Sequence, residues 1–240
     1  MTCVHAVLSP PEISDLRSVD LGGTVCVVFD VLRATSSIVT GIAHGVHRIF
    51  PAETIEEARE IKATHPEALL GGERKGERIA GFDIGNSPAE YCELKGREII
   101  TTTTNGTFAL RACERAKAIL PGSLLNIGGL AATVAELAPE NLLLVCAGTG
   151  RGFAMEDAIG AGALIERLPR SGLELSDAAR AVLNLHRFYA GDLLSALSTS
   201  KNGRALARIG KTRDIEWCAQ VSVYPEVGCM ADGMITIHRG

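Results

Sequence analysis

The chain has 240 residues, of which 46% are hydrophobic and 4% aromatic, and its formal net charge is -4. A slightly acidic chain with no basic, aromatic-interleaved run argues against nucleic-acid binding. No apolar run reaches the ~20 residues of a membrane span, and the N-terminus lacks the pattern of a secretory signal. Seven cysteines at irregular spacing, without a CxxC pair, indicate a reducing compartment. These features predict a single cytoplasmic domain over residues 1–240 that binds neither nucleic acid nor membranes.

Short apolar runs alternate with helix-like patterns along most of the chain. Thr54 and Glu57 form a capping box that predicts the start of a helix, and Asp232-Gly233 is a favoured two-residue hairpin turn. Strands are predicted, in chain order, over residues 4–8, 25–29, 48–50, 68–70, 98–102, 117–120, 123–125, 142–146, 221–227 and 234–238. Helices are predicted in most of the intervals between these strands, and the last third of the chain is the most helical.

This alternation predicts the fold class α/β, as a three-layer α/β/α sandwich with a mixed, largely parallel sheet. A weak internal repeat is visible. Residues 35–51 and 107–121 both run from a hydroxyl residue through a helix and a short strand to a proline. Each copy follows a strand with a polar turn, so the chain is compatible with two intertwined, similar βα units.

Three polar turns between an apolar strand and a helix have the same design. They are FDVLRATSS at the end of residues 25–29, TTTTNGT at the end of residues 98–102, and CAGTGRG at the end of residues 142–146. In a parallel sheet such turns converge at the carboxyl ends of the strands, where α/β proteins place their ligands. Helix N-termini there favour phosphate or sulfonate oxygens. The sequence therefore predicts an anion site.

Charged side chains in and near these turns suggest the chemistry. Arg33 can fork two anion oxygens, and Asp30 is the first candidate for a Mg²⁺ ligand, since Mg²⁺ favours one or two carboxylates plus substrate oxygens. The Gly-rich connection over residues 71–88 is long enough to be functional. Each feature has a plainer interpretation: Asp30 as a helix cap, GTGRG as a tight turn, and Glu156-Asp157 as partners of a helix N-terminus.

In series, FDVLRATSSIVT, LLGGERKGERIAGFDIGNSP, TTTTNGT and CAGTGRGFAMED closely resemble the 2-phosphosulfolactate phosphatase (ComB) family. The resemblance continues more faintly through SKNGRAL and VYPEV, and so covers nearly the whole chain. It implies a Mg²⁺-dependent acid phosphatase that hydrolyses 2-phosphosulfolactate to sulfolactate in coenzyme M biosynthesis.

On these grounds we predict a site for a small anionic phosphate ester and for Mg²⁺. The catalytic residues are predicted to be Asp30, Arg33, Glu73 and Glu156, and the metal ligands Asp30, Asp83 and Asp157. The substrate is predicted to contact Thr35, Ser36, Asn86, Ser87, Thr104, Asn105, Gly106, Thr107, Gly148 and Thr149. Asp30 has two competing roles, as a metal ligand or as a nucleophile that forms an aspartyl-phosphate. The sequence is compatible with a homodimer and does not decide the oligomeric state.

Three other functions stay open at this point. The substrate can be a different small phosphate ester. A second alternative is a nucleotide-dependent enzyme that uses GTGRG as a phosphate cradle. Against it, the sequence has no acidic residue at the usual spacing to bind the ribose. The chain can also be an anion-binding module without hydrolase activity, which would keep the glycines and arginines but would not need the acid clusters.

Overall fold

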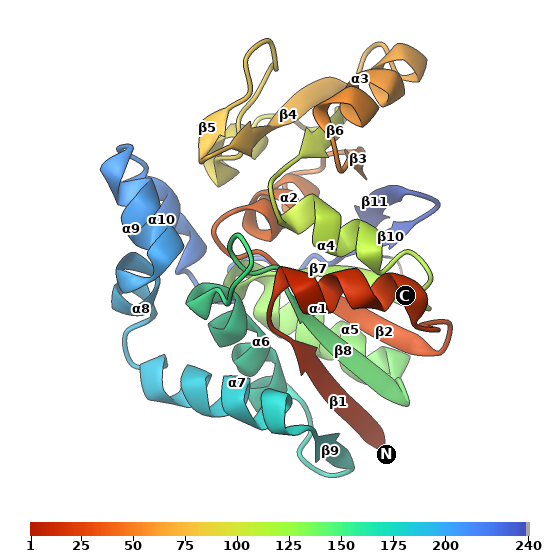
Figure 1. The fold of residues 1–240 in the computed structure, drawn as a ribbon, viewed down its shortest axis with the longest axis vertical. Coiled ribbons are helices and arrows are strands. Elements are labelled where there is room, and N and C mark those ends of the chain that lie inside the picture. Colours follow the sequence, from red (N-terminus) through yellow and green to blue (C-terminus); the bar gives the residue numbers. More distant parts are fainter. Residues whose placement is uncertain (239–240) are drawn as a thin grey trace.

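Eleven strands form one mixed sheet in the computed structural model, which describes residues 1–238 (Figure 1). The strands are β1 (Thr2–Val7), β2 (Thr24–Phe29), β3 (Arg48–Pro51), β4 (Leu69–Arg74), β5 (Glu77–Arg78), β6 (Glu98–Thr102), β7 (Ala118–Gly122), β8 (Asn141–Cys146), β9 (Leu173–Leu175), β10 (Gly228–Ala231) and β11 (Met234–Ile237). Their order across the sheet is β5-β4-β6-β3-β11-β10-β7-β2-β8-β1-β9.

Helices cover the sheet and follow most of its strands. They are α1 (Pro10–Asp15), α2 (Ala34–Ala43), α3 (Ile55–Thr64), α4 (Gly106–Ala112), α5 (Ile127–Leu137), α6 (Met155–Arg167), α7 (Asp177–Tyr189), α8 (Leu193–Thr199), α9 (Lys201–Arg208) and α10 (Thr212–Cys218). Three short 3₁₀ helices are η1 (Leu16–Ser18), η2 (Pro88–Tyr91) and η3 (Leu124–Asn126). None of the helices over residues 1–238 has the length and apolar character needed to cross a bilayer.

Strand β2 is apolar at every position from Val25 to Phe29 because both of its faces are buried. Because side chains alternate across a strand, Val25, Val27 and Phe29 face a cluster that includes residues of α5, α6 and α7. Cys26 and Val28 face the opposite cluster, which includes residues of α1, α2 and α4. The strand is buried on both faces, as predicted, and this part of the sheet is the middle of a three-layer sandwich.

The β10–β11 hairpin divides the sheet into two halves, β5-β4-β6-β3 and β7-β2-β8-β1-β9. The two repeated segments cross between these halves. The first unit runs β2–α2–β3, and β3 pairs in parallel with β6; the second runs β6–α4–β7, and β7 pairs in parallel with β2. Each unit therefore begins in one half and ends in the other. The antiparallel hairpin β10–β11 lies between β7 and β3, so β6 runs opposite to β2. The sheet is mixed, as predicted, and the two βα units are intertwined, an arrangement with which the repeat was compatible.

Helices α2 and α4 lie between the two halves of the sheet, with β3, β4 and β6 on one side and β2, β7 and β8 on the other (Figure 1). Ile42 and Leu110 pack with side chains of both halves, including Val28 and Ile99. Helix α2 follows the carboxyl end of β2, and α4 follows that of β6. Their N-termini meet in the middle of the molecule, where Gly106 of α4 packs against Ala34 of α2.

Local signals were partly right. The Oγ1 of Thr54 accepts a hydrogen bond from the Glu57 N–H at 3.0 Å, which confirms the predicted cap of α3. The strand predicted over residues 123–125 is wrong: Ser123 caps η3 there, because its Oγ accepts from the Leu125 N–H. The Asp232-Gly233 turn is correct, but the strand before it begins at Gly228 rather than within 221–227.

Candidate active site

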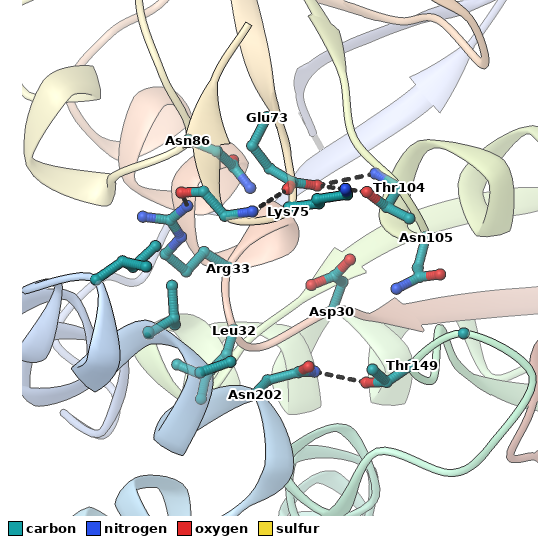
Figure 2. A pocket seen from close by; sticks show the side chains of 15 residues that line it. Asp30, Leu32, Arg33, Glu73, Lys75, Asn86, Thr104, Asn105, Thr149 and Asn202 are labelled. Carbon is teal, nitrogen blue, oxygen red and sulfur yellow. Dashed lines mark hydrogen bonds between the residues drawn. The ribbon is translucent and has the colours of Figure 1, made fainter.

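A cavity of about 320 Å³ opens where the two halves of the sheet meet (Figure 2). All three predicted turns reach it, together with the β4–β5 turn and helix α9. Its lining consists of Asp30, Leu32, Arg33, Glu73, Lys75, Gly76, Asn86, Thr104, Asn105, Thr149, Gly150, Asn202, Ala205, Leu206 and Ile209. We expected the three turns to converge along one edge of a parallel sheet, and this expectation is wrong. The turn after β6 comes from the opposite half and meets the other two across α2 and α4.

Asp30 is the acid at the centre of this cavity. Its side chain is partly buried at the end of β2, and its Oδ1 accepts a hydrogen bond from the Ala34 N–H at 3.2 Å. Burial, aided by the negative charges of Glu73 and Glu156, raises the pKa of Asp30 to about 7. A carboxyl held in this way is unstable as an isolated anion, and a nearby cation stabilises its charged form.

The hydroxyl groups of the two intertwined units have structural partners. The Oγ1 of Thr35 accepts from the Asp30 N–H at 3.0 Å, and the Oγ1 of Thr107 accepts from the Thr103 N–H at 3.1 Å. Ser36 donates its Oγ hydrogen to the Val31 carbonyl oxygen at 2.7 Å. All three side chains are buried and outside the cavity lining. They shape the turns that hold Asp30 and Asn105, and the structure does not bring them to the substrate space.

Gly106 sets how closely the N-termini of α2 and α4 approach each other. A Cβ at this position would lie 2.5 Å from the Cβ of Ala34 and 2.7 Å from the Oδ2 of Asp30. Both separations are far below van der Waals contact, so only glycine fits without a shift. Gly106 is therefore a packing requirement for the placement of Asp30.

We expect Gly106→Ala to displace Asp30 and to lower kcat/KM by ~10–100-fold, since misplacement by about 1 Å costs that much in a preorganised site. Overpacking should also reduce the free energy of unfolding by about 1–3 kcal/mol. Steady-state kinetics and thermal unfolding of the purified variant measure both. Gly23→Ala is the matched control, because a Cβ at Gly23 meets nothing within 4 Å. Equal behaviour of the two variants would contradict this role.

Glu73 joins two of the loops that line the cavity. Its Oε1 accepts from the backbone N–H and the Oγ1 hydroxyl of Thr104, both at 2.9 Å, and its Oε2 accepts from the Gly76 N–H at 2.7 Å (Figure 2). Both carboxylate oxygens therefore have protein donors. The geometry supports a role in holding Thr104 and the β4–β5 turn around the substrate space.

Glu156 and Asp157, at the start of α6, lie buried behind the cavity. The Oε1 of Glu156 accepts from the Nδ2 of Asn202 at 2.6 Å. The same Nδ2 donates to the Oγ1 of Thr149 at 2.6 Å (Figure 2). The Oε2 of Glu156 has no hydrogen-bond partner. Burial raises the pKa of Glu156, and burial together with the charges of Glu156 and Asp30 raises the pKa of Asp157.

Asp157 ties two of the polar turns together through the backbone. Its Oδ1 accepts from the Val31 N–H at 2.8 Å, and its Oδ2 accepts from the Gly148 N–H at 3.0 Å. Asp157 and Gly148 are outside the cavity lining. The role of Asp157 in this structure is to fix the β2–α2 turn against the β8–α6 turn.

Arg33 lines the cavity, but its guanidinium already has partners. NH1 donates to the Oδ2 of Asp214 at 2.5 Å, and NH2 donates to the Gly76 carbonyl oxygen at 2.7 Å. The Oδ1 of Asp214 accepts from the Oγ of Ser87 at 2.6 Å. Arg33 and Asp214 are both buried. This network fastens α10 and the loop at Ser87 to the β2–α2 turn, so Ser87 supports the cavity from behind.

Asp83 is not brought together with the other acids. It is exposed, and its Oδ2 accepts from the Leu70 N–H at 2.8 Å, outside the cavity lining. Asn86 does line the cavity, and its buried Oδ1 has no hydrogen-bond partner. The Asp83 carboxylate therefore ties the loop after β5 to strand β4 at Leu70, beside the bond from the Asp83 N–H to the Leu70 carbonyl oxygen at 2.9 Å.

Sequence reasoning missed three polar residues that line the cavity or support it from behind. Lys75 lies within the Gly-rich connection that we had singled out by its length, and Asn202 lies within the SKNGRAL segment of the family resemblance. Both segments carried a signal, although neither indicated the residue. Asp214 carried none, because nothing local distinguishes it from an ordinary acid in the first turn of a helix.

The oxygen donors around Asp30 fit a Mg²⁺ ion. No group of three or more His, Cys, Asp or Glu side chains placed to hold a metal occurs within residues 1–238. Mg²⁺ does not need such a group, because it keeps several waters and takes one or two carboxylates. The raised pKa of Asp30 and the unpartnered, buried Oε2 of Glu156 are the features that a cation would satisfy.

The family model for 2-phosphosulpholactate phosphatase matches residues 11–233, which makes the protein a phosphoric monoester hydrolase. The chain belongs to this family. Relatives named probable 2-phosphosulfolactate phosphatase share 38% identity over 224 residues in Symbiobacterium thermophilum and 40% over 216 residues in Carboxydothermus hydrogenoformans. These alignments cover 91% and 88% of this chain, and 96% and 89% of the two relatives.

Proposed function

We propose that this protein hydrolyses 2-phosphosulfolactate to sulfolactate and phosphate with the help of Mg²⁺, the type of step that belongs to coenzyme M biosynthesis. The observation that carries the proposal is the partly buried carboxyl of Asp30 in a cavity that several polar side chains line, in a chain of this family. Seven unpaired cysteines suit a reducing cytoplasm as its location.

The residues of the cavity divide the work in this proposal. Asp30 and the free Oε2 of Glu156 would hold Mg²⁺, which when bound supplies positive charge that stabilises the phosphoryl oxygens in the transition state. The side chains of Asn105 and Thr149 would orient the phosphate by donating hydrogen bonds to its oxygens, and Thr104 lines the cavity beside them. Glu73 positions Thr104 by accepting its N–H, and Asn202 positions Thr149 by donating to its Oγ1.

The test is a product assay with purified protein and MgCl₂. We expect phosphate and sulfolactate to appear in equal amounts from 2-phosphosulfolactate, measured by phosphate release and mass spectrometry. Phospholactate, which lacks the sulfonate, and ATP are the comparison substrates. Faster turnover of phospholactate would favour another small phosphate ester as substrate, and hydrolysis of ATP alone would favour the nucleotide-dependent alternative. Binding of inorganic phosphate without any hydrolysis would favour the anion-binding module.

A further inference from the structure

The β4–β5 turn contains a lysine in a backbone conformation that does not suit it. Glu73 pairs with Arg78 and Arg74 pairs with Glu77, which leaves Lys75 and Gly76 as a two-residue hairpin turn. Their φ angles are +56° and +83°. A turn with two positive φ angles strongly prefers Asn-Gly or Asp-Gly, since side chains other than those of Asn, Asp and Gly are strained there. The turn itself therefore gives no reason for a lysine.

The turn is held firmly in this conformation from both sides. The Gly76 N–H donates to the Oε2 of Glu73 at 2.7 Å, and the Gly76 carbonyl oxygen accepts from Arg33 at 2.7 Å. Arg74 donates to the carbonyl oxygen and to the Oγ1 of Thr102, at 3.3 and 3.1 Å. The surroundings thus fix the direction in which the Lys75 side chain leaves the backbone.

That direction brings Lys75 to the cavity. Lys75 is one of the cavity-lining residues, and Figure 2 shows its side chain extending from the turn toward the side where Thr104 lies. Lys75 is exposed and forms no ion pair with any residue of the described part of the chain. Its ammonium group is therefore available to a ligand.

The charge balance of the cavity requires such a cation. The lining residues Asp30 and Glu73 are acids, and Arg33 and Lys75 are the lining bases. Arg33 is committed to Asp214 and to Gly76, and its side chain is only 3% exposed. The proposed substrate carries a phosphate, a sulfonate and a carboxylate. Among the lining side chains of the described chain, Lys75 is the cation left to meet these groups.

We propose that Lys75 is a substrate-binding residue that holds an anionic group of the substrate at the mouth of the cavity. This inference rests on the proposed function, and it assigns to Lys75 a recognition role that accounts for the unfavourable turn. Because an ammonium group on a flexible stem binds anions as a point charge in ground state and transition state alike, its removal should chiefly raise KM.

The test uses Lys75→Asn, which installs the residue that the turn prefers. We expect kcat/KM for 2-phosphosulfolactate to fall ~10–100-fold, mostly through KM, which is the range of one charge-assisted hydrogen bond. The melting temperature should stay the same or rise, because Asn tolerates the positive φ. Lys75→Arg keeps the charge and the strain, and its kcat/KM should stay within about fivefold of the wild type.

The second hairpin of the sheet supplies a matched control. Asp232 and Gly233 form a two-residue turn between Ala231 and Met234, with φ angles of +49° and +75°. Asp232→Lys places a lysine in an equivalent turn outside the cavity. We expect this variant to melt at a lower temperature than the wild type and to keep its kinetics. Such a result would separate the strain of a lysine in this turn from its use in the site.

Binding of inorganic phosphate and of sulfolactate, measured by calorimetry, keeps this test separate from the test of function. Weaker binding of either product by Lys75→Asn than by the wild type supports the inference, even if the wild type hydrolyses none of the esters. Unchanged kinetics and unchanged product binding in Lys75→Asn would overturn it. A wild type that binds both products but hydrolyses no phosphate ester would instead refute the proposed function.

Discussion

Asp30→Asn is expected to lower kcat by at least ~10³-fold, equivalent to about 4 kcal/mol of activation free energy. Asparagine keeps the size of the side chain and its acceptor for the Ala34 N–H, so the β2–α2 turn should keep its shape. It removes the charge that a metal ligand or a nucleophile requires. Steady-state phosphate release with a circular dichroism spectrum of the folded variant measures the effect.

Asp83→Asn is the control for this substitution, because Asp83 is an exposed acid outside the cavity. Its turnover should stay close to that of the wild type. Near-normal turnover of folded Asp30→Asn would return Asp30 to a structural role as a helix cap. Rapid quench or hydroxylamine trapping in the wild type then distinguishes the two catalytic roles, since only a nucleophilic Asp30 forms a phosphoryl-aspartate.

Removal of divalent metal with EDTA is the second large effect that we expect. Phosphatase activity should fall at least ~10³-fold, in line with the several kcal/mol that a Lewis acid contributes. Mg²⁺ should restore it, and Mn²⁺ should restore it less well. Activity that survives rigorous chelation would refute the proposed metal and most of the carboxylate roles.

The melting temperature gives a readout of metal binding that does not depend on turnover. Added Mg²⁺ should raise it, because a ligand that binds only the folded state stabilises that state. The rise should be larger at pH 8 than at pH 5. The pKa of Asp30 is about 7, so at pH 5 the carboxyl is protonated and metal must displace the proton. In Asp30→Asn the rise should shrink at both pH values.

The sequence predicted the elements of the site better than their partners. The strand Val25–Phe29 was recognisable because a strand buried on both faces is apolar throughout, and Asp30 stood out because it ends that run. The three polar turns do line one cavity, but not along one edge of a parallel sheet, because β6 runs opposite to β2. The strand and its terminal acid were predictable because each depends on one segment only.

What the sequence did not reveal depends on contacts between distant segments. Arg33 looked like an open anion fork, but Asp214, which is 181 residues away, occupies it. Asp157 looked like a metal ligand, but the N–H groups of Val31 and Gly148 take its two oxygens. In both cases the partner that decides what the side chain contacts lies on another element, so the local sequence could not reveal it.

The exchange of strands between the two halves has a consequence for how the protein folds and comes apart. Strand β2 acquires its neighbours β7 and β8 only after more than ninety further residues have been added, since Val25 pairs with Ala118 and with Leu142. Such non-local pairing slows folding, because long loops must close before their contacts form. Neither half has a complete set of strands without the chain that starts in the other. Because the chain crosses between the halves, unfolding of either half leaves strands of both halves without their partners and exposes their edges. The cavity between the halves is lost in the same event.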